Sequence, residues 1–287
     1  MRLASPSLPL LAFAAAAASS CCAAEAAPEP EYIFTNPPAF KSSDYRIPTS
    51  YESAVLGRRI LALTPLGTLA TVFPGSSSSD DAQFSDQEDR PRGLGGMPLG
   101  LMDYVADCEG EGNPTILAIN IATSFKNVRA GSNISLAQHW TPRYPPAKRI
   151  KSTAAGAVLD WFLGRDDDDD DTKGATTSYS AANLPRFNLL GYLEKIDDPS
   201  SSQDDLAACF VAAHPDAKYW LPGNRIHASE FVRLVVTQVY WIGGFGDRAY
   251  IGWIPVDEWK NVTRAEWERV TLPGEKKGWK EWSSAEL

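Results

Sequence analysis

Alternating apolar and polar residues predict seven β-strands along this chain. The clearest alternation covers residues 115–124, where Leu117, Ile119 and Ile121 form an apolar face and the residues between them are small or polar. Six further segments have strand-like patterning or composition, and these are residues 67–73, 98–105, 134–140, 186–196, 230–242 and 248–254. A Gly-Gly pair separates the last two segments and favours a tight turn or bulge there.

Capping signals and helical spacing predict three helices. Thr49 and Glu52 fit a capping box, in which both side chains satisfy free backbone amides at the start of a helix. Arg58 lies beside the apolar stripe of this first helix. Apolar residues at helical spacing predict a second helix that ends at a His-Pro pair, and Thr263 with Glu266 predicts the start of a third.

This order of elements predicts an α+β barrel of six or more antiparallel strands, because few helices accompany many strands joined by short turns. The predicted organisation is a signal peptide at residues 1–26, an extended arm at 27–48, a single domain at 49–270 and a C-terminal tail at 271–287. Low-complexity inserts at about 75–96 and 141–182 interrupt the domain.

The N-terminus has the features of a secretory signal peptide. Arg2 precedes an apolar run at residues 8–18, and an A-x-A pattern follows at residues 24–26. The run is shorter than the roughly 20 residues of a membrane-spanning helix. A mitochondrial presequence or a disordered tail is the alternative. We therefore expect a secreted protein, or one in the lumen of the secretory pathway.

If the protein is exported, the two cysteines beyond the leader and two of the asparagines become candidates for covalent modification. Cys108 and Cys209 lie beyond the leader, and in an oxidising compartment they either form a disulfide or remain two buried free thiols. Asn133 and Asn261 begin N-x-S/T sequons. Each is a glycosylation site provided that it lies on the surface.

Charge and missing motifs exclude several function classes. The formal net charge is -9, which argues against nucleic acid because phosphate binding needs clustered Lys and Arg. Six consecutive aspartates at residues 166–171 lack the spaced ligands and turn glycine of a calcium loop. The three histidines have no metal-site spacing, and no P-loop, HExxH or nucleophile elbow occurs. We predict no metal site and no membrane span.

Three segments carry a family resemblance. They are SFKNVRAGSNISL at residues 124–136, HPDAKYW at 214–220 and WIGGFGDRAYIGWI at 241–254. Together and in this order, they resemble the CREG-type branch of the pyridoxamine-phosphate-oxidase-like superfamily, whose fold is an FMN-binding split β-barrel. The resemblance implies an antiparallel, Greek-key-like split barrel, and the leader and sequons resemble the secreted, homodimeric glycoproteins of the CREG branch.

The resemblance also implies a candidate cofactor site. Asn127 matches an asparagine that caps a short helical turn in the superfamily, with ligand contact as its alternative role, and Ser124 stands where many oxidase-type members have a histidine. Lys126, Arg129 and Arg248 are the basic residues that could hold a flavin phosphate. CREG proteins are thought not to bind FMN, and this sequence is closer to that state, since the usual basic signature is not evident.

Three functions from different classes follow from these observations. The leading interpretation is a secreted, glycosylated homodimer that binds an unknown protein partner, with no cofactor and no catalysis. An FMN-dependent oxidoreductase is the second, and a haem-binding or other tetrapyrrole-binding protein is the third. No catalytic residue is assigned, because fold alone does not determine function.

Overall fold

The computed structural model describes residues 46–75, 91, 93–146, 181–197, 203–246 and 249–279. The predicted signal peptide and most of the N-terminal arm and of both inserts lie outside these residues.

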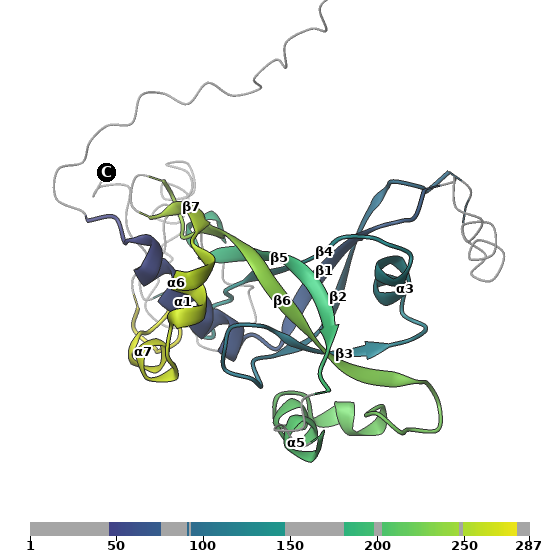
Figure 1. Ribbon diagram of the computed structural model, residues 1–287. Coiled ribbons are helices and arrows are strands. Elements are labelled where there is room, and N and C mark those ends of the chain that lie inside the picture. The colour runs from purple at the N-terminus through teal and green to yellow at the C-terminus, as the bar shows by residue number, and fades with distance from the viewer. Residues whose placement is uncertain are drawn as a thin grey trace, which may run out of the picture. The chain divides into compact units, whose positions relative to one another are not determined.

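The described residues form seven strands, five α-helices and two short 3-10 helices, which Figure 1 traces from α1 to α7. In chain order they are α1 (Ser50–Leu63), β1 (Leu66–Val72), β2 (Pro98–Ala106), β3 (Thr115–Ile119), α3 (Thr123–Arg129), β4 (Ile134–His139), η1 (Ala181–Asn183), β5 (Arg186–Lys195), α5 (Gln203–Ala213), η2 (Pro215–Tyr219), β6 (Ser229–Ile242), β7 (Ile251–Ile254), α6 (Val256–Asn261) and α7 (Arg264–Arg269).

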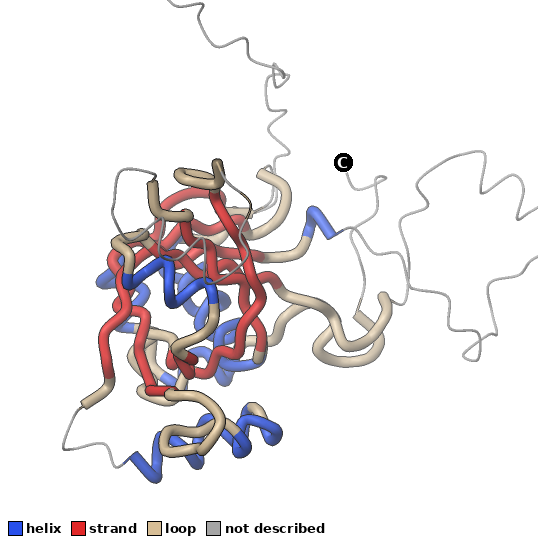
Figure 2. Tube along the Cα trace, turned by 90° about the vertical axis from the view of Figure 1, so that its right-hand side faces the viewer, coloured by secondary structure: helices blue, strands red, loops and turns tan. Residues whose placement is uncertain are grey.

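Six antiparallel strands close into a barrel. The sheet runs in the order β3-β2-β1-β4-β5-β6-β7, and β3 also pairs with β6, so that only β7 lies outside the closed ring. In Figure 2 the strands gather in one body with the helices around them. The α+β split-barrel fold predicted from the sequence is confirmed, with six barrel strands and one additional strand.

β6 closes the barrel because it is long enough to pair with three strands. Its first part pairs with β3, most of its length pairs with β5, and its last four residues pair with β7. A bulge opposite Gly191 lets the strand bend, and a Cβ at residue 191 would clash with the Val235 carbonyl oxygen. The Asn113 side chain accepts a hydrogen bond from the Val236 amide at 3.0 Å, which satisfies a donor beside the irregularity.

The barrel core is built from rows of paired side chains that point inward. Leu69, Leu136, Leu189 and Val239 follow one another across β1, β4, β5 and β6, and each has no exposed surface. Burying each aliphatic side chain of this kind contributes about 1.5–3 kcal/mol to folding. Because every second residue of these strands points into this row, apolar residues alternate with polar or small ones along each strand, and that alternation allowed the strands to be predicted.

The strand predicted at residues 115–124 differs from the observed structure. β3 ends at Ile119, and residues 123–129 form α3, whose Phe125 packs in the barrel core. Ile116 and Ala118 face the core, whereas Leu117 packs in a second apolar cluster beneath α5. The predicted apolar face is therefore wrong for this strand, because α5 covers the outer side of β3 and both sides are buried.

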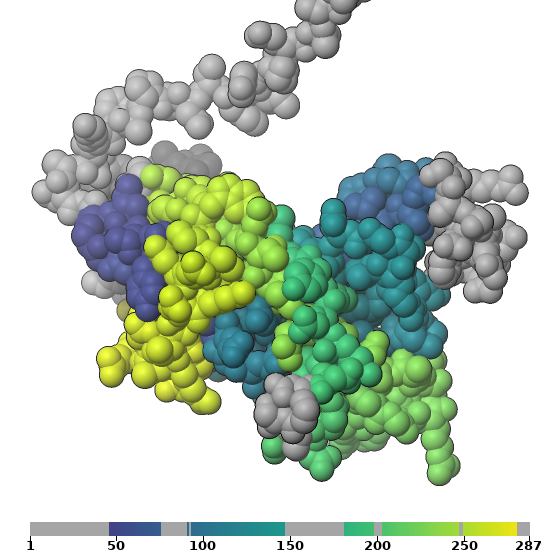
Figure 3. Space-filling view, viewed as in Figure 1, coloured from purple at the N-terminus to yellow at the C-terminus, as the bar shows by residue number. Residues whose placement is uncertain are grey.

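α1 and the C-terminal helices pack together on the barrel. The capping box predicted at Thr49 and Glu52 begins α1, and the one at Thr263 and Glu266 begins α7. The Glu266 carboxylate accepts hydrogen bonds from the Thr263 hydroxyl and amide and, at 2.7 Å, from the Tyr51 hydroxyl, and these bonds lower the pKa of Glu266 to about 2. Figure 3 shows the purple α1 segment in contact with the yellow C-terminal segment.

The chain continues to pack beyond the predicted domain boundary at residue 270. Leu272 is 2% exposed and belongs to the barrel core. The Trp140 indole donates to the Pro273 carbonyl oxygen at 2.5 Å, and the Arg59 guanidinium pairs with Glu275. α6 was not predicted, because its apolar residues are too few to form a recognisable stripe.

Arg58 is fully buried rather than lying at the edge of an apolar stripe. Its guanidinium pairs with Asp107 at 3.3 Å and donates to the carbonyl oxygens of Gly110, Trp259 and Val262. A buried cation is tolerated only when its charge is paired and most of its donors are bonded, and here the two terminal nitrogens are bonded while Nε has no partner among the described residues. Arg58 thereby joins α1 to the loop after β2 and to the C-terminal end of α6.

We predict that Arg58→Met destabilises the protein by about 3–5 kcal/mol, because it leaves Asp107 and several carbonyl groups without their partner in the interior. Urea unfolding followed by far-ultraviolet circular dichroism measures the change. Arg264→Met is the matched control, since the Arg264–Glu268 pair is exposed and its removal should have little effect. Equal stability of the two variants would contradict a central role for Arg58.

Candidate functional site

Four of the residues predicted to hold a cofactor lie together on α3. Ser124 and Asn127 are 2% and 3% exposed, Lys126 is half-buried and Arg129 is exposed. Arg248, the fifth, lies outside the described residues. The structure therefore places the α3 group on one short helix beside β1, with two of its four side chains directed into the protein.

Asn127 has a structural contact rather than the predicted cap. Its side-chain amide donates to the Thr71 hydroxyl of β1 at 3.1 Å, and Thr71 is 2% exposed. The expectation that Asn127 caps a helical turn is wrong, because Ala122 occupies the N-cap position and Asn127 lies inside the helix. The two buried polar groups satisfy one another, which buried polar side chains require.

The described α3 residues do not fit a flavin phosphate. Such an anion needs several charged or amide donors directed at one point outside the fold. Ser124 and Asn127 are buried, and the Arg129 guanidinium donates to the Asn120 backbone oxygen. We therefore derive no chemical step through FMN.

Both asparagines predicted as glycosylation sites lie on the surface, as glycosylation requires. Asn133 lies just before β4 and Asn261 is the last residue of α6, and both are exposed. Each asparagine is thus accessible at the surface for modification.

The strands carry an uncharged surface that sequence analysis missed, called here the outer face. One row across the sheet is formed by Met102, Thr68, Ala137, Asn188, Tyr240 and Trp253. A second row is formed by Gly100, Ala70, Ser135, Leu190 and Gln238. On β1, β4, β5 and β6 the residue between the two rows belongs to the fully buried inner row, so the side chains of both rows point away from the core on these strands. None of the side chains in either row carries a formal charge at neutral pH.

The outer face has the composition of a contact surface. Met102 is 68% exposed and Trp253 is 56% exposed, and the Tyr240 and Trp253 rings lie 5.1 Å apart. The solvated face of an antiparallel sheet is ordinarily polar, with charged residues at many outward positions. The sequence does show uncharged residues at alternate positions of the predicted strands. Which of these residues lie side by side on one surface depends on the strand register, and the sequence does not show that register.

The sequence model of the CREG β-barrel family matches residues 48–261. That match covers most of the chain. The protein belongs to the CREG β-barrel family. No curated protein sequence matches it.

Solved structures with a similar chain path include a heme binding protein from Mycobacterium smegmatis. It is 18% identical at a TM-score of 0.45, over 75% of this chain and 61% of that protein, so this chain spans less than two thirds of its length. HutZ, the heme storage protein of Vibrio cholerae, is 11% identical at a TM-score of 0.34, over 62% and 87% of the two chains. A FAD-binding protein from Mesorhizobium loti is 11% identical at a TM-score of 0.32, over 63% and 87%. Likenesses at this level do not indicate what this chain binds.

None of the helices in the described ranges has both the length and the apolar character needed to cross a bilayer. Within the same ranges, no three His, Cys, Asp or Glu side chains are grouped so that they could hold a metal ion.

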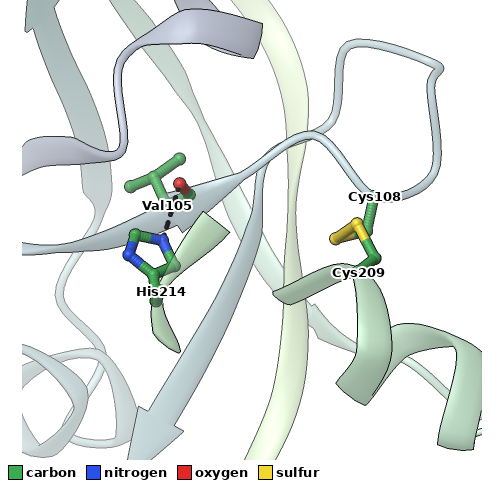
Figure 4. Close-up of a disulfide and its surroundings, with 4 residues drawn as sticks. All are labelled: Val105, Cys108, Cys209 and His214. Carbon is green, nitrogen blue, oxygen red and sulfur yellow. Dashed lines mark hydrogen bonds between the residues drawn. A yellow bond between two sulfur atoms is a disulfide. The ribbon is translucent and has the colours of Figure 1, made fainter. Parts of the chain in front are cut away.

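A disulfide attaches α5 to the CREG barrel. Cys108 follows β2 and Cys209 lies on α5, with their Cα atoms 5.9 Å apart (Figure 4). The bond closes a loop with a sequence separation of 101 residues. Cross-links over long loops typically contribute about 2–4 kcal/mol, by restricting the unfolded chain. Phe210 of α5 is fully buried, and its ring packs against Phe231 of β6.

His214 holds the end of α5 against β2. Its imidazole Nε2 lies 3.1 Å from the Val105 carbonyl oxygen (Figure 4), and the ring stacks on Tyr104 with centroids 4.4 Å apart. The Tyr104 hydroxyl in turn donates to Asp216 at 2.5 Å. Desolvation lowers the pKa of His214, although the contact with Val105 and the charge of Asp216 oppose that shift.

Burial of His214 predicts a pH-dependent component of stability. Because the folded pKa lies below the ordinary value of 6.5, the unfolded chain takes up a proton first as the pH falls. The free energy of unfolding should therefore fall from about pH 6.5 downward, until the pH passes the folded pKa. His214→Phe keeps an aromatic ring against Tyr104 and should remove this component. Urea unfolding of both proteins at about pH 7.5 and about pH 5.5 measures it, and an identical pH dependence would refute the assignment.

Proposed function

We propose that this CREG-family protein is a secreted, glycosylated homodimer that acts as a non-catalytic binding protein. The observation that carries the proposal is the outer face, an uncharged surface that spans six strands. A dimer that buries it would present the rest of each barrel to a protein partner.

The composition of the outer face supports self-association. Interface cores are enriched in aromatic residues and methionine and depleted of charged residues, and the exposed Met102 and Trp253 fit that description. Small residues at Ala70 and Ala137 allow two sheets to approach closely.

Two observations support export of the protein. Disulfides persist mainly in oxidising compartments, and the Cys108–Cys209 bond is of this kind. The sequons at Asn133 and Asn261 are exposed, as a glycan requires. Together with the N-terminal sequence pattern, they favour the secretory route.

The contacts of α3 support a binding role over flavin catalysis. Asn127 is engaged with Thr71 and Arg129 with Asn120, so these side chains stabilise the barrel instead of facing an anionic ligand. We assign no residue to acid, base or nucleophilic chemistry. Haem binding remains an alternative outcome of the experiment below, with no described residue assigned as its ligand.

We expect Ala137→Glu to convert the dimer to a monomer, since two buried carboxylates without partners would meet in the interface. Size-exclusion chromatography with light scattering reports the mass of each protein. The control is Ala212→Glu, which adds the same charge at an exposed position of α5. A monomeric wild-type protein, or a dimer unaffected by Ala137→Glu, would count against the outer face as the contact.

We expect protein purified from the medium of secreting cells to be colourless. Titration with FMN or haemin should give no saturable flavin or Soret band, because the described α3 residues are engaged within the fold. Absorbance spectroscopy makes the measurement, with a flavin-binding protein as positive control. A dissociation constant for FMN in the micromolar range or tighter would replace the proposal with the oxidoreductase alternative, and a saturable Soret band would replace it with haem binding.

A further inference from the structure

α5 is held on the barrel by few non-covalent contacts. Of its eleven residues, only Leu206 and Phe210 are buried. At its start the Gln203 side-chain amide donates to the Ile196 carbonyl oxygen at 3.1 Å, and just beyond its end His214 contacts β2. Isolated helices of this length are marginal in water. The helix therefore depends on its attachment to the barrel for its structure.

The barrel does not depend on α5 in the same way. Within the described part of the chain, the main core contains no residue of α5 or η2. α5 packs instead in a separate cluster, over a surface formed by Ala106 of β2, Leu117 of β3, Ile196 after β5 and Phe231 of β6. We call this the covered surface. Because the two clusters share no residue, α5 can leave the barrel without opening the main core.

The Cys108–Cys209 disulfide is the covalent part of the attachment. Cys209 lies within α5, directly before Phe210, and Cys108 lies two residues beyond the end of β2 (Figure 4). Both cysteines are half-buried, so the bond lies near the surface and outside the main core. Exposed disulfides are generally more labile than those sealed in a core.

We propose that α5 is a redox-controlled cover. When a dithiol reduces the Cys108–Cys209 disulfide, α5 detaches from the barrel and exposes the covered surface. When the bond forms again, α5 returns. Large exposed apolar patches act as contact sites for other molecules, so the redox state of one bond decides whether the barrel offers such a site here.

The reduction is an ordinary thiol–disulfide exchange. One thiolate of the dithiol attacks a sulfur of the bond, and the other cysteine leaves as a thiolate and takes up a proton. The second thiol of the dithiol then attacks the mixed disulfide and releases the first cysteine. Two electrons pass to the protein, which gains two thiols, and the dithiol becomes a disulfide.

Hydrogen–deuterium exchange of the full-length protein, followed by mass spectrometry, tests the release of α5, with dithiothreitol as the dithiol. We expect the amides of residues 203–213 to exchange about 30-fold faster after reduction, the factor that corresponds to the lower end of a disulfide's usual contribution. The amides of β4 and β5 should keep their protection, because the main core contains no residue of α5.

Exposure of the covered surface has a separate readout. The dye ANS binds exposed apolar surface, so it should fluoresce more strongly with the reduced protein than with the oxidised protein. Removal of dithiothreitol and reoxidation in air should restore both the slow exchange and the low fluorescence. Failure to restore them would contradict a reversible cover.

The matched variant carries Cys108→Ser and Cys209→Ser. It should exchange like the reduced wild type and should not respond to dithiothreitol, which excludes an effect of the reagent itself. Reduction of the folded wild type provides the comparison if this variant does not fold.

Three results would overturn the proposal. Residues 203–213 that stay protected after reduction would show that the non-covalent contacts hold α5 by themselves. Loss of protection in β4 and β5 at the same time would show that the bond stabilises the whole fold. Faster exchange without ANS binding would show that the covered surface stays hidden. Dimerisation is tested separately, because the outer face contains no residue of α5 or of the covered surface.

Discussion

The pairing of β3 with β6 is the constraint on which the rest of this structure depends. Without it, the seven strands would form an open sheet with unpaired edges, and the inner row of leucine and valine side chains would face water. Closure requires β6 to turn from β5 toward β3, and the bulge opposite Gly191 allows that turn. The Asn113 side chain satisfies a backbone donor of the bulged strand, so that closure leaves this group paired.

Two attachments hold the helices in place on the closed barrel. Arg58 joins α1 to the loop after β2 and to the segment containing α6 through charge and hydrogen bonds in the interior. The Cys108–Cys209 disulfide and the buried Phe210 attach α5 to the outer side of the barrel. One attachment is an ion pair with hydrogen bonds, and the other is covalent and apolar.

The α3 residues that were predicted to hold a cofactor are divided between the interior and the surface. Ser124 and Asn127 lie in the interior, where Asn127 donates a hydrogen bond to Thr71, whereas Lys126 is half-buried and Arg129 is exposed. Two other features of the surface are the uncharged outer face across six strands and the pocket lined by Trp241.

The sequence by itself determined most of the strands, both capping boxes and the family, because alternation and helix-start signals depend on neighbouring residues. It also identified Cys108 and Cys209 as a pair, but left open whether they bond, since that depends on a distance across the fold. Only the tertiary structure decided that Arg58 is buried, that Leu117 faces α5 and that Asn127 bonds Thr71. The outer face and the Trp241 pocket likewise come from strand register and from packing between distant segments. Contacts of this kind join residues far apart in the chain, and local sequence patterns carry no information about them.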